Sequence, residues 1–164
     1  MRSLLLVLVV LFAAGCSQSS PVQPDPASAA AVPDGQDLRS PEADQGGRPL
    51  SIAMTGAAEA PGPGDPDGTG TATITLNHGQ GQVCFELTVA NIDTATAAHI
   101  HEAPVGVPGP VVVGLTPPAT GSSAGCVAVA PALVKEIQQN PAAYYVNVHN
   151  AAFPAGAVRG QLTK

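Results

Sequence analysis

Short stretches of alternating apolar and polar residues recur from about residue 49 to the C-terminus. Because successive side chains of an extended strand point to opposite faces, each stretch predicts a β-strand with one buried face. The stretch 111–115 is almost wholly apolar, which predicts a short buried strand. The expected strands are 50–54, 71–76, 82–90, 97–102, 111–115, 126–129, 144–150 and 157–163.

Only Pro131 to Asn140 has helical spacing, through Leu133, Val134 and Ile137, and the following proline ends the helix. Six to eight short strands with one helix predict an all-β fold, an antiparallel sandwich of two sheets. The many Gly (18) and Pro (17) residues suit short strands joined by turns. His78 falls in one such turn, 77–81, and is expected to be exposed.

The first 15 residues have the features of an export signal. Arg2 precedes an apolar run, Leu4 to Phe12, that is too short for a stable membrane span. The run Ala13-Ala14-Gly15-Cys16 resembles the bacterial lipobox, in which the leader is removed before a Cys that then carries lipid. We therefore expect residues 1–15 to be a lipoprotein signal peptide and Cys16 to anchor the chain to a bacterial membrane. The alternative is a secreted protein cut after a small residue.

Residues 16–48 are rich in Pro, Ala and Ser and have few large apolar side chains. Such a segment cannot bury enough surface to offset the entropy of ordering it, so we expect a disordered tether. A tether of this length would reach roughly 30 Å. The folded domain is then expected to span 49–164, outside the cytoplasm, facing the periplasm or the exterior.

The formal net charge of −6 argues against a nucleic-acid partner, because no cluster of Lys or Arg exists to neutralise phosphates. Besides the membrane, the expected partner is an envelope or extracellular ligand that the sequence does not identify.

The cysteines suggest a disulfide. Cys84 and Cys126 both point away from the apolar face of their strands. In an exported protein whose Cys16 carries lipid, they are the only pair left, so a Cys84–Cys126 disulfide follows by elimination.

Three of the four histidines fall on the polar faces of predicted strands. His99 and His101 project together from one strand, and His149 shares a face with Tyr145 and Asn147 on another. Any site of this domain is expected on that face.

Arg159 lies on the last predicted strand, out of phase with Val158 and Leu162. If the last two strands pair as a hairpin, its side chain reaches the same polar face as His149. There it could brace loop carbonyls and carboxylates or sit over an anionic ligand.

Several short motifs occur in a fixed order between Leu50 and Leu162. They are Gly56-Ala57-Ala58-Glu59-Ala60-Pro61, Gly68-Thr69-Gly70-Thr71-Ala72, Ala98-His99-Ile100-His101, Gly109-Pro110-Val111-Val112, Tyr145-Val146-Asn147-Val148-His149 and Gly156-Ala157-Val158-Arg159-Gly160-Gln161-Leu162. Together they resemble the CHRD domain. The resemblance implies an immunoglobulin-like, Greek-key β-sandwich in an extracellular module, with no established catalytic activity.

Two functions are consistent with these residues. In the first, the chain is a non-enzymatic binding or structural module, and His99, His101, His149, Asn147 and Arg159 form a polar network that fixes the fold. In the second, the three histidines bind a metal, most plausibly copper, because imidazole suits copper and zinc. The His-x-His strand with a distant His and an Arg weakly resembles the copper site of copper/zinc superoxide dismutase. That enzyme's bridging His and zinc ligands have no counterpart here, so dismutase activity is not expected.

Overall fold

The computed structural model describes residues 47–164. The expected signal peptide, Cys16 and nearly all of the expected tether lie outside the described residues. The strands are β1 (Leu50–Thr55), β2 (Thr69–Asn77), β3 (Gln82–Ala90), β4 (Ala95–Glu102), β5 (Val111–Leu115), β6 (Ser122–Ala128), β7 (Tyr144–Asn150) and β8 (Val158–Gln161). The helices are α1 (Pro131–Gln139) and the single 3-10 turns η2 (Gly56–Ala58) and η3 (Pro141–Ala143).

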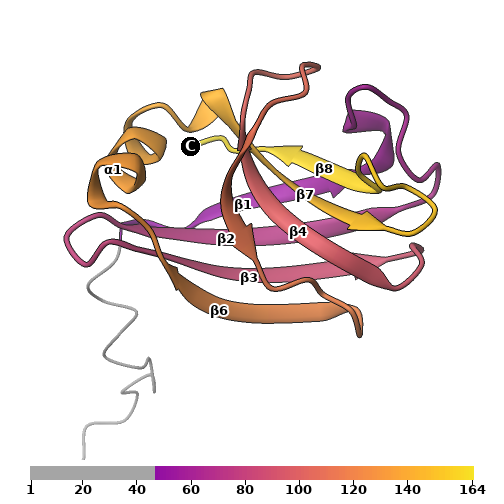
Figure 1. Cartoon of the computed structure of the whole chain (residues 1–164), viewed down its shortest axis with the longest axis horizontal. Coiled ribbons are helices and arrows are strands. Elements are labelled where there is room, and N and C mark those ends of the chain that lie inside the picture. The colour runs from indigo at the N-terminus through magenta and orange to yellow at the C-terminus, as the bar shows by residue number, and fades with distance from the viewer. Residues whose placement is uncertain (1–46) are drawn as a thin grey trace, which may run out of the picture. The chain divides into compact units, whose positions relative to one another are not determined.

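The eight strands form one sheet in the order β5-β4-β7-β8-β1-β2-β3-β6, and every pairing is antiparallel (Figure 1). The expected all-β antiparallel fold is confirmed, but its separation into two sheets is not. Two four-stranded halves meet where β1 pairs with β8, through the single bridge Thr55–Arg159. Alternation along a strand reveals its faces but not its neighbours, so the sequence pattern could not show this bridge.

Apolar side chains from both halves of the sheet pack into one core. Ile52 and Leu87 come from one half, and Ile100 and Val148 come from the other. The sheet therefore curls around a common core, as the alternating pattern requires if every strand buries its apolar face. The strand β5 is an edge strand, so the predicted burial holds for Val113 and Leu115 but not for Val111, which is 52% exposed.

The helix α1 contacts β2 and β3 and buries Val134 and Ile137 completely. Pro131 occupies its first turn, where a missing N–H costs no hydrogen bond. His78 is exposed in the β2–β3 turn as predicted, and its Nδ1 lies 3.0 Å from Gln138 Oε1 on the helix. Among residues 47–164, neither α1 nor any other helix has the length and apolar character needed to cross a membrane.

Cys84 and Cys126 lie directly opposite each other on β3 and β6 and form a disulfide. This confirms the pairing predicted by elimination. The bond ties the edge strand β6 to the sheet. It is also a bond of the kind that persists in oxidising compartments.

Candidate metal centre

The three strand histidines lie on one face of the half-sheet formed by β5, β4, β7 and β8. The pairing of β4 with β7 sets His101 opposite Tyr145, His99 opposite Asn147, and Ala97 opposite His149. Because directly opposed residues project to the same face, this register brings the three imidazole rings together, as the sequence predicted.

The nitrogens of these rings are close enough to hold one ion. One nitrogen from each of His99, His101 and His149 lies within 4.8 Å of the other two. His99 Nδ1–H donates a hydrogen bond of 3.2 Å to His149 Nε2, because His149 Nδ1 already carries the proton of its own ring. Two nitrogens that bind one ion tetrahedrally at about 2.0 Å are about 3.3 Å apart, so this pair already has the spacing of two metal ligands.

The surroundings of His101 fix which of its nitrogens carries the proton. Nδ1 lies 2.8 Å from the carbonyl oxygen of Gly109, which can only accept, so Nδ1–H donates. In the neutral ring Nε2 then carries a lone pair. That nitrogen is buried and has no hydrogen-bond partner among the described residues. A buried lone pair without a donor is costly, and a bound cation would satisfy it.

His149 is anchored in the same way. Its Nδ1 donates to the carbonyl oxygen of Pro154 at 3.1 Å, which leaves Nε2 as the nitrogen directed at the cluster. Nε2 also lies 3.0 Å from Asn147 Oδ1. Because Nδ1 carries the proton of the neutral ring, Nε2 is an acceptor, and its partner at Asn147 is the amide nitrogen once the amide turns over.

The electrostatics favour neutral rings. Burial, followed by the neighbouring His149 and His101, lowers the pKa of His99 below its ordinary value. Burial also lowers the pKa of His149, with a smaller opposing effect from its bond to Pro154. Neutral imidazole is the form that binds metals, so the lowered pKa values of His99 and His149 favour metal binding.

Arg159 is 1% exposed and lies beneath the loop 103–110, which joins β4 to β5. Its guanidinium donates to the carbonyl oxygens of Val107 and Pro104, both at 2.9 Å. The predicted role of bracing loop carbonyls is thus confirmed. Its Cζ also lies 3.4 Å from the centre of the Tyr145 ring.

Tyr145 connects Arg159 to the histidines. One face of its ring meets the guanidinium, and the ring stacks on His101 with centroids 4.7 Å apart. Its hydroxyl accepts from the backbone N–H of Gly109, whose carbonyl holds His101. Tyr145 therefore supports His101 twice, a role that the sequence analysis did not identify.

Glu59 is a second residue that the sequence analysis missed as part of this face. It is 8% exposed, and its side chain hydrogen-bonds Asn147. Burial raises its pKa to about 7, although the nearby Arg159 opposes the shift. A Cβ at Gly156, where φ is +145°, would clash with this carboxyl group, so only glycine fits above it. The sequence did contain a signal for this contact, because Glu59 and Gly156 both belong to the motifs that resemble the CHRD domain.

One side of the cluster is open. Gly114 on β5 is exposed and lies opposite His99. A Cβ built at Gly114 would have no neighbour within 4 Å. A side chain added at Gly114 would therefore extend into open space on the side of His99.

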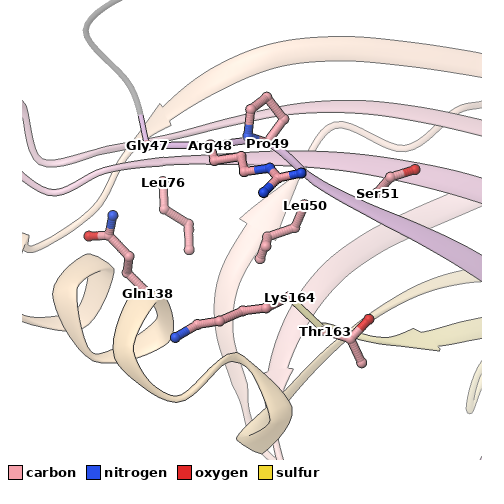
Figure 2. Close-up of a pocket in the computed structure, with 9 residues that line it drawn as sticks. All are labelled: Gly47, Arg48, Pro49, Leu50, Ser51, Leu76, Gln138, Thr163 and Lys164. Carbon is pink, nitrogen blue, oxygen red and sulfur yellow. The ribbon is translucent and has the colours of Figure 1, made fainter.

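A separate cavity of about 730 Å³ lies between the start of β1, the helix α1 and the C-terminus. Figure 2 shows the side chains of Leu50, Leu76 and Lys164 directed into it from different elements. None of its lining residues belongs to the histidine cluster.

Comparisons with known proteins agree with the motifs. No curated protein and no solved structure matches the chain. The CHRD domain matches residues 50–162, which include all three clustered histidines, Glu59, Tyr145 and Arg159. This match covers more than half of the chain and nearly all of its described residues, and the chain therefore belongs to the CHRD domain family.

Proposed function

We propose that this CHRD domain is a non-enzymatic, extracytoplasmic binding module that holds one copper ion through His99, His101 and His149. The main support for this proposal is the position of the ring nitrogens of the three histidines. His99 Nδ1 and His149 Nε2 are 3.2 Å apart, and the nearby Nε2 of His101 is buried without a partner among the described residues.

The hydrogen bonds that hold the rings of His101 and His149 are typical of metal-binding histidines. Metal-binding histidines commonly donate their second N–H to a carbonyl or carboxylate, which fixes the tautomer and the ring direction. His101 and His149 both do so, to Gly109 and Pro154. Imidazole ligands suit copper and zinc, and copper is the metal of this proposal.

The proposal includes attachment to a bacterial membrane through lipid on Cys16, with residues 16–48 as a tether. The leader sequence and the internal disulfide both support an oxidising location outside the cytoplasm. No reaction is proposed, because the described residues around the histidines supply structural support and no nucleophile with its base.

Titration of the purified protein with Cu²⁺, monitored by calorimetry, tests the proposal. We expect one tight site in the parent and at least a hundredfold loss of affinity in His101→Ala and in His149→Ala. His78→Ala is the matched control, since His78 lies on the exposed β2–β3 turn, away from the cluster, and hydrogen-bonds Gln138. Equal binding by the parent and both cluster variants would leave the histidines as a structural network only.

A further inference from the structure

The charges around the histidine cluster bear on which ion it retains. Among residues 47–164, no Asp, Glu or Cys joins the three histidines as a potential ligand. The ligand set is therefore three neutral imidazoles, two of them fixed by backbone carbonyls. Such a set contributes no negative charge to offset that of a bound ion.

A positively charged residue, Arg159, lies close to the cluster. Arg159 stacks on Tyr145, and Tyr145 stacks on His101, so the guanidinium lies one aromatic ring away from a ligand. Arg159 and His101 are both buried, and solvent screens such a pair poorly. Glu59 offsets this cation only in part, because burial raises its pKa to about 7.

Two effects therefore disfavour a divalent ion relative to a monovalent one. The cost of placing an ion in a low-dielectric site rises with the square of its charge, and repulsion by Arg159 adds to it. Ligand number points in the same direction. Among residues 47–164 three ligands are offered, a number that the filled d shell of Cu⁺ accepts, whereas Cu²⁺ and Zn²⁺ would each need a further ligand such as water.

We propose that the site selects monovalent copper, binding Cu⁺ through His99 Nδ1, His101 Nε2 and His149 Nε2 in preference to Cu²⁺ and Zn²⁺. This inference rests on the proposed metal-binding function and names the oxidation state of its ligand. Preferential binding of Cu⁺ raises the reduction potential of the bound ion, which protects it from oxidation outside the cytoplasm.

Competition measurements on the purified protein test the selectivity. Cu⁺ is measured against bicinchoninate under anaerobic, reducing conditions, and Cu²⁺ and Zn²⁺ are measured against chelators of known affinity. We expect the Kd for Cu⁺ to be at least 100-fold below that for Cu²⁺. This ratio corresponds to a potential about 120 mV above that of the aqueous couple, at about 59 mV per tenfold change.

A variant at Gly114 tests the electrostatic cause. Glutamate fits there without a clash at Cβ and lies opposite His99, so Gly114→Glu adds a carboxylate beside the site. We expect it to reduce the preference for Cu⁺ over Cu²⁺ by tenfold or more, while the neutral control Gly114→Gln leaves the preference within threefold.

The outcomes separate the two proposals. If the parent binds Cu²⁺ or Zn²⁺ as tightly as Cu⁺, the selectivity is refuted and the metal site stands. If Gly114→Glu and Gly114→Gln behave alike, the electrostatic cause of the selectivity is refuted. If the parent binds none of the three ions, or if His101→Ala and His149→Ala bind them as the parent does, the proposed function itself fails.

Discussion

The rings of His101 and Tyr145 are stacked almost in parallel, with 8° between their planes and 4.7 Å between their centroids. The two residues are direct partners in the pairing of β4 with β7, so the sheet register itself creates this contact. A candidate ligand is thereby held between an aromatic ring and a backbone carbonyl, and its free nitrogen has a defined direction.

Replacing Tyr145 tests this support. Tyr145→Leu removes the stacking surface, and we expect copper affinity to fall tenfold or more, within the range typical of residues that orient metal ligands. Tyr145→Phe keeps the ring and loses only the hydrogen bond from Gly109. It should cost about 1 kcal/mol of stability and change the affinity less than threefold. Equal copper affinity in the two variants would show that the stacking does not position His101.

The predicted pH dependence of stability centres on Glu59. Its pKa is raised from 4.5 to about 7 in the folded protein, so the folded state binds this proton more tightly than the unfolded chain does. Well below pH 4.5, Glu59 is protonated in both the folded and the unfolded state, so its ionisation does not reduce the free energy of unfolding. It destabilises the fold progressively as pH rises from about 4.5 to about 7, by on the order of 2 to 3 kcal/mol.

Glu59→Gln keeps the shape of the protonated side chain and cannot ionise. We expect urea denaturation to show that the variant is more stable than the parent at pH 8 and that the difference narrows towards pH 5. If the variant is instead less stable at pH 8, ionised Glu59 stabilises the fold through Arg159, and the account of this carboxyl group is wrong.

The disulfide is expected to contribute strongly to stability. Cys84 and Cys126 are 42 residues apart, and the chain-entropy argument gives about 4 kcal/mol for a loop of this size. The double variant Cys84→Ala/Cys126→Ala should unfold at markedly lower urea concentration than the oxidised parent. The fully reduced parent serves as the control and should resemble the double variant. Alkylation of the unreduced parent should find neither cysteine free.

The anchor prediction concerns Cys16, which lies outside the described residues. Changing Cys16 to Ala should release the protein from the membrane fraction or leave the leader uncleaved, because the lipid attachment site is lost. Fractionation followed by mass measurement of the product distinguishes these results. A processed product that stays fully membrane-bound without Cys16 would rule out lipid anchoring at this residue.

Much of the fold could be predicted from the sequence, because burial of one face imposes a period of two on each strand. The bounds of β3 and β7 agree with the alternating stretches, and Val134 and Ile137 lie buried on α1 as expected. The single sheet could not be predicted, because strand order depends on pairing between distant segments. The exposure of Val111 was missed for the same reason, since only its position at the edge of the sheet determines it.

The site was predictable only in part. Alternation placed His99, His101, His149, Asn147 and Arg159 on one face, and the structure confirms this. Glu59 and the carbonyls of Gly109 and Pro154 come from loops, whose paths have no periodic pattern. The alternation of residues along the strands therefore could not predict which residues fix the histidine rings.

The most direct test of the central claim is a crystal structure of the copper-loaded protein, with anomalous scattering measured on both sides of the copper absorption edge. The account predicts one anomalous peak about 2 Å from His99 Nδ1, His101 Nε2 and His149 Nε2, with the bonds from His101 to Gly109 and from His149 to Pro154 retained. A peak bound elsewhere, or no peak while the three histidines keep their present contacts, would contradict it.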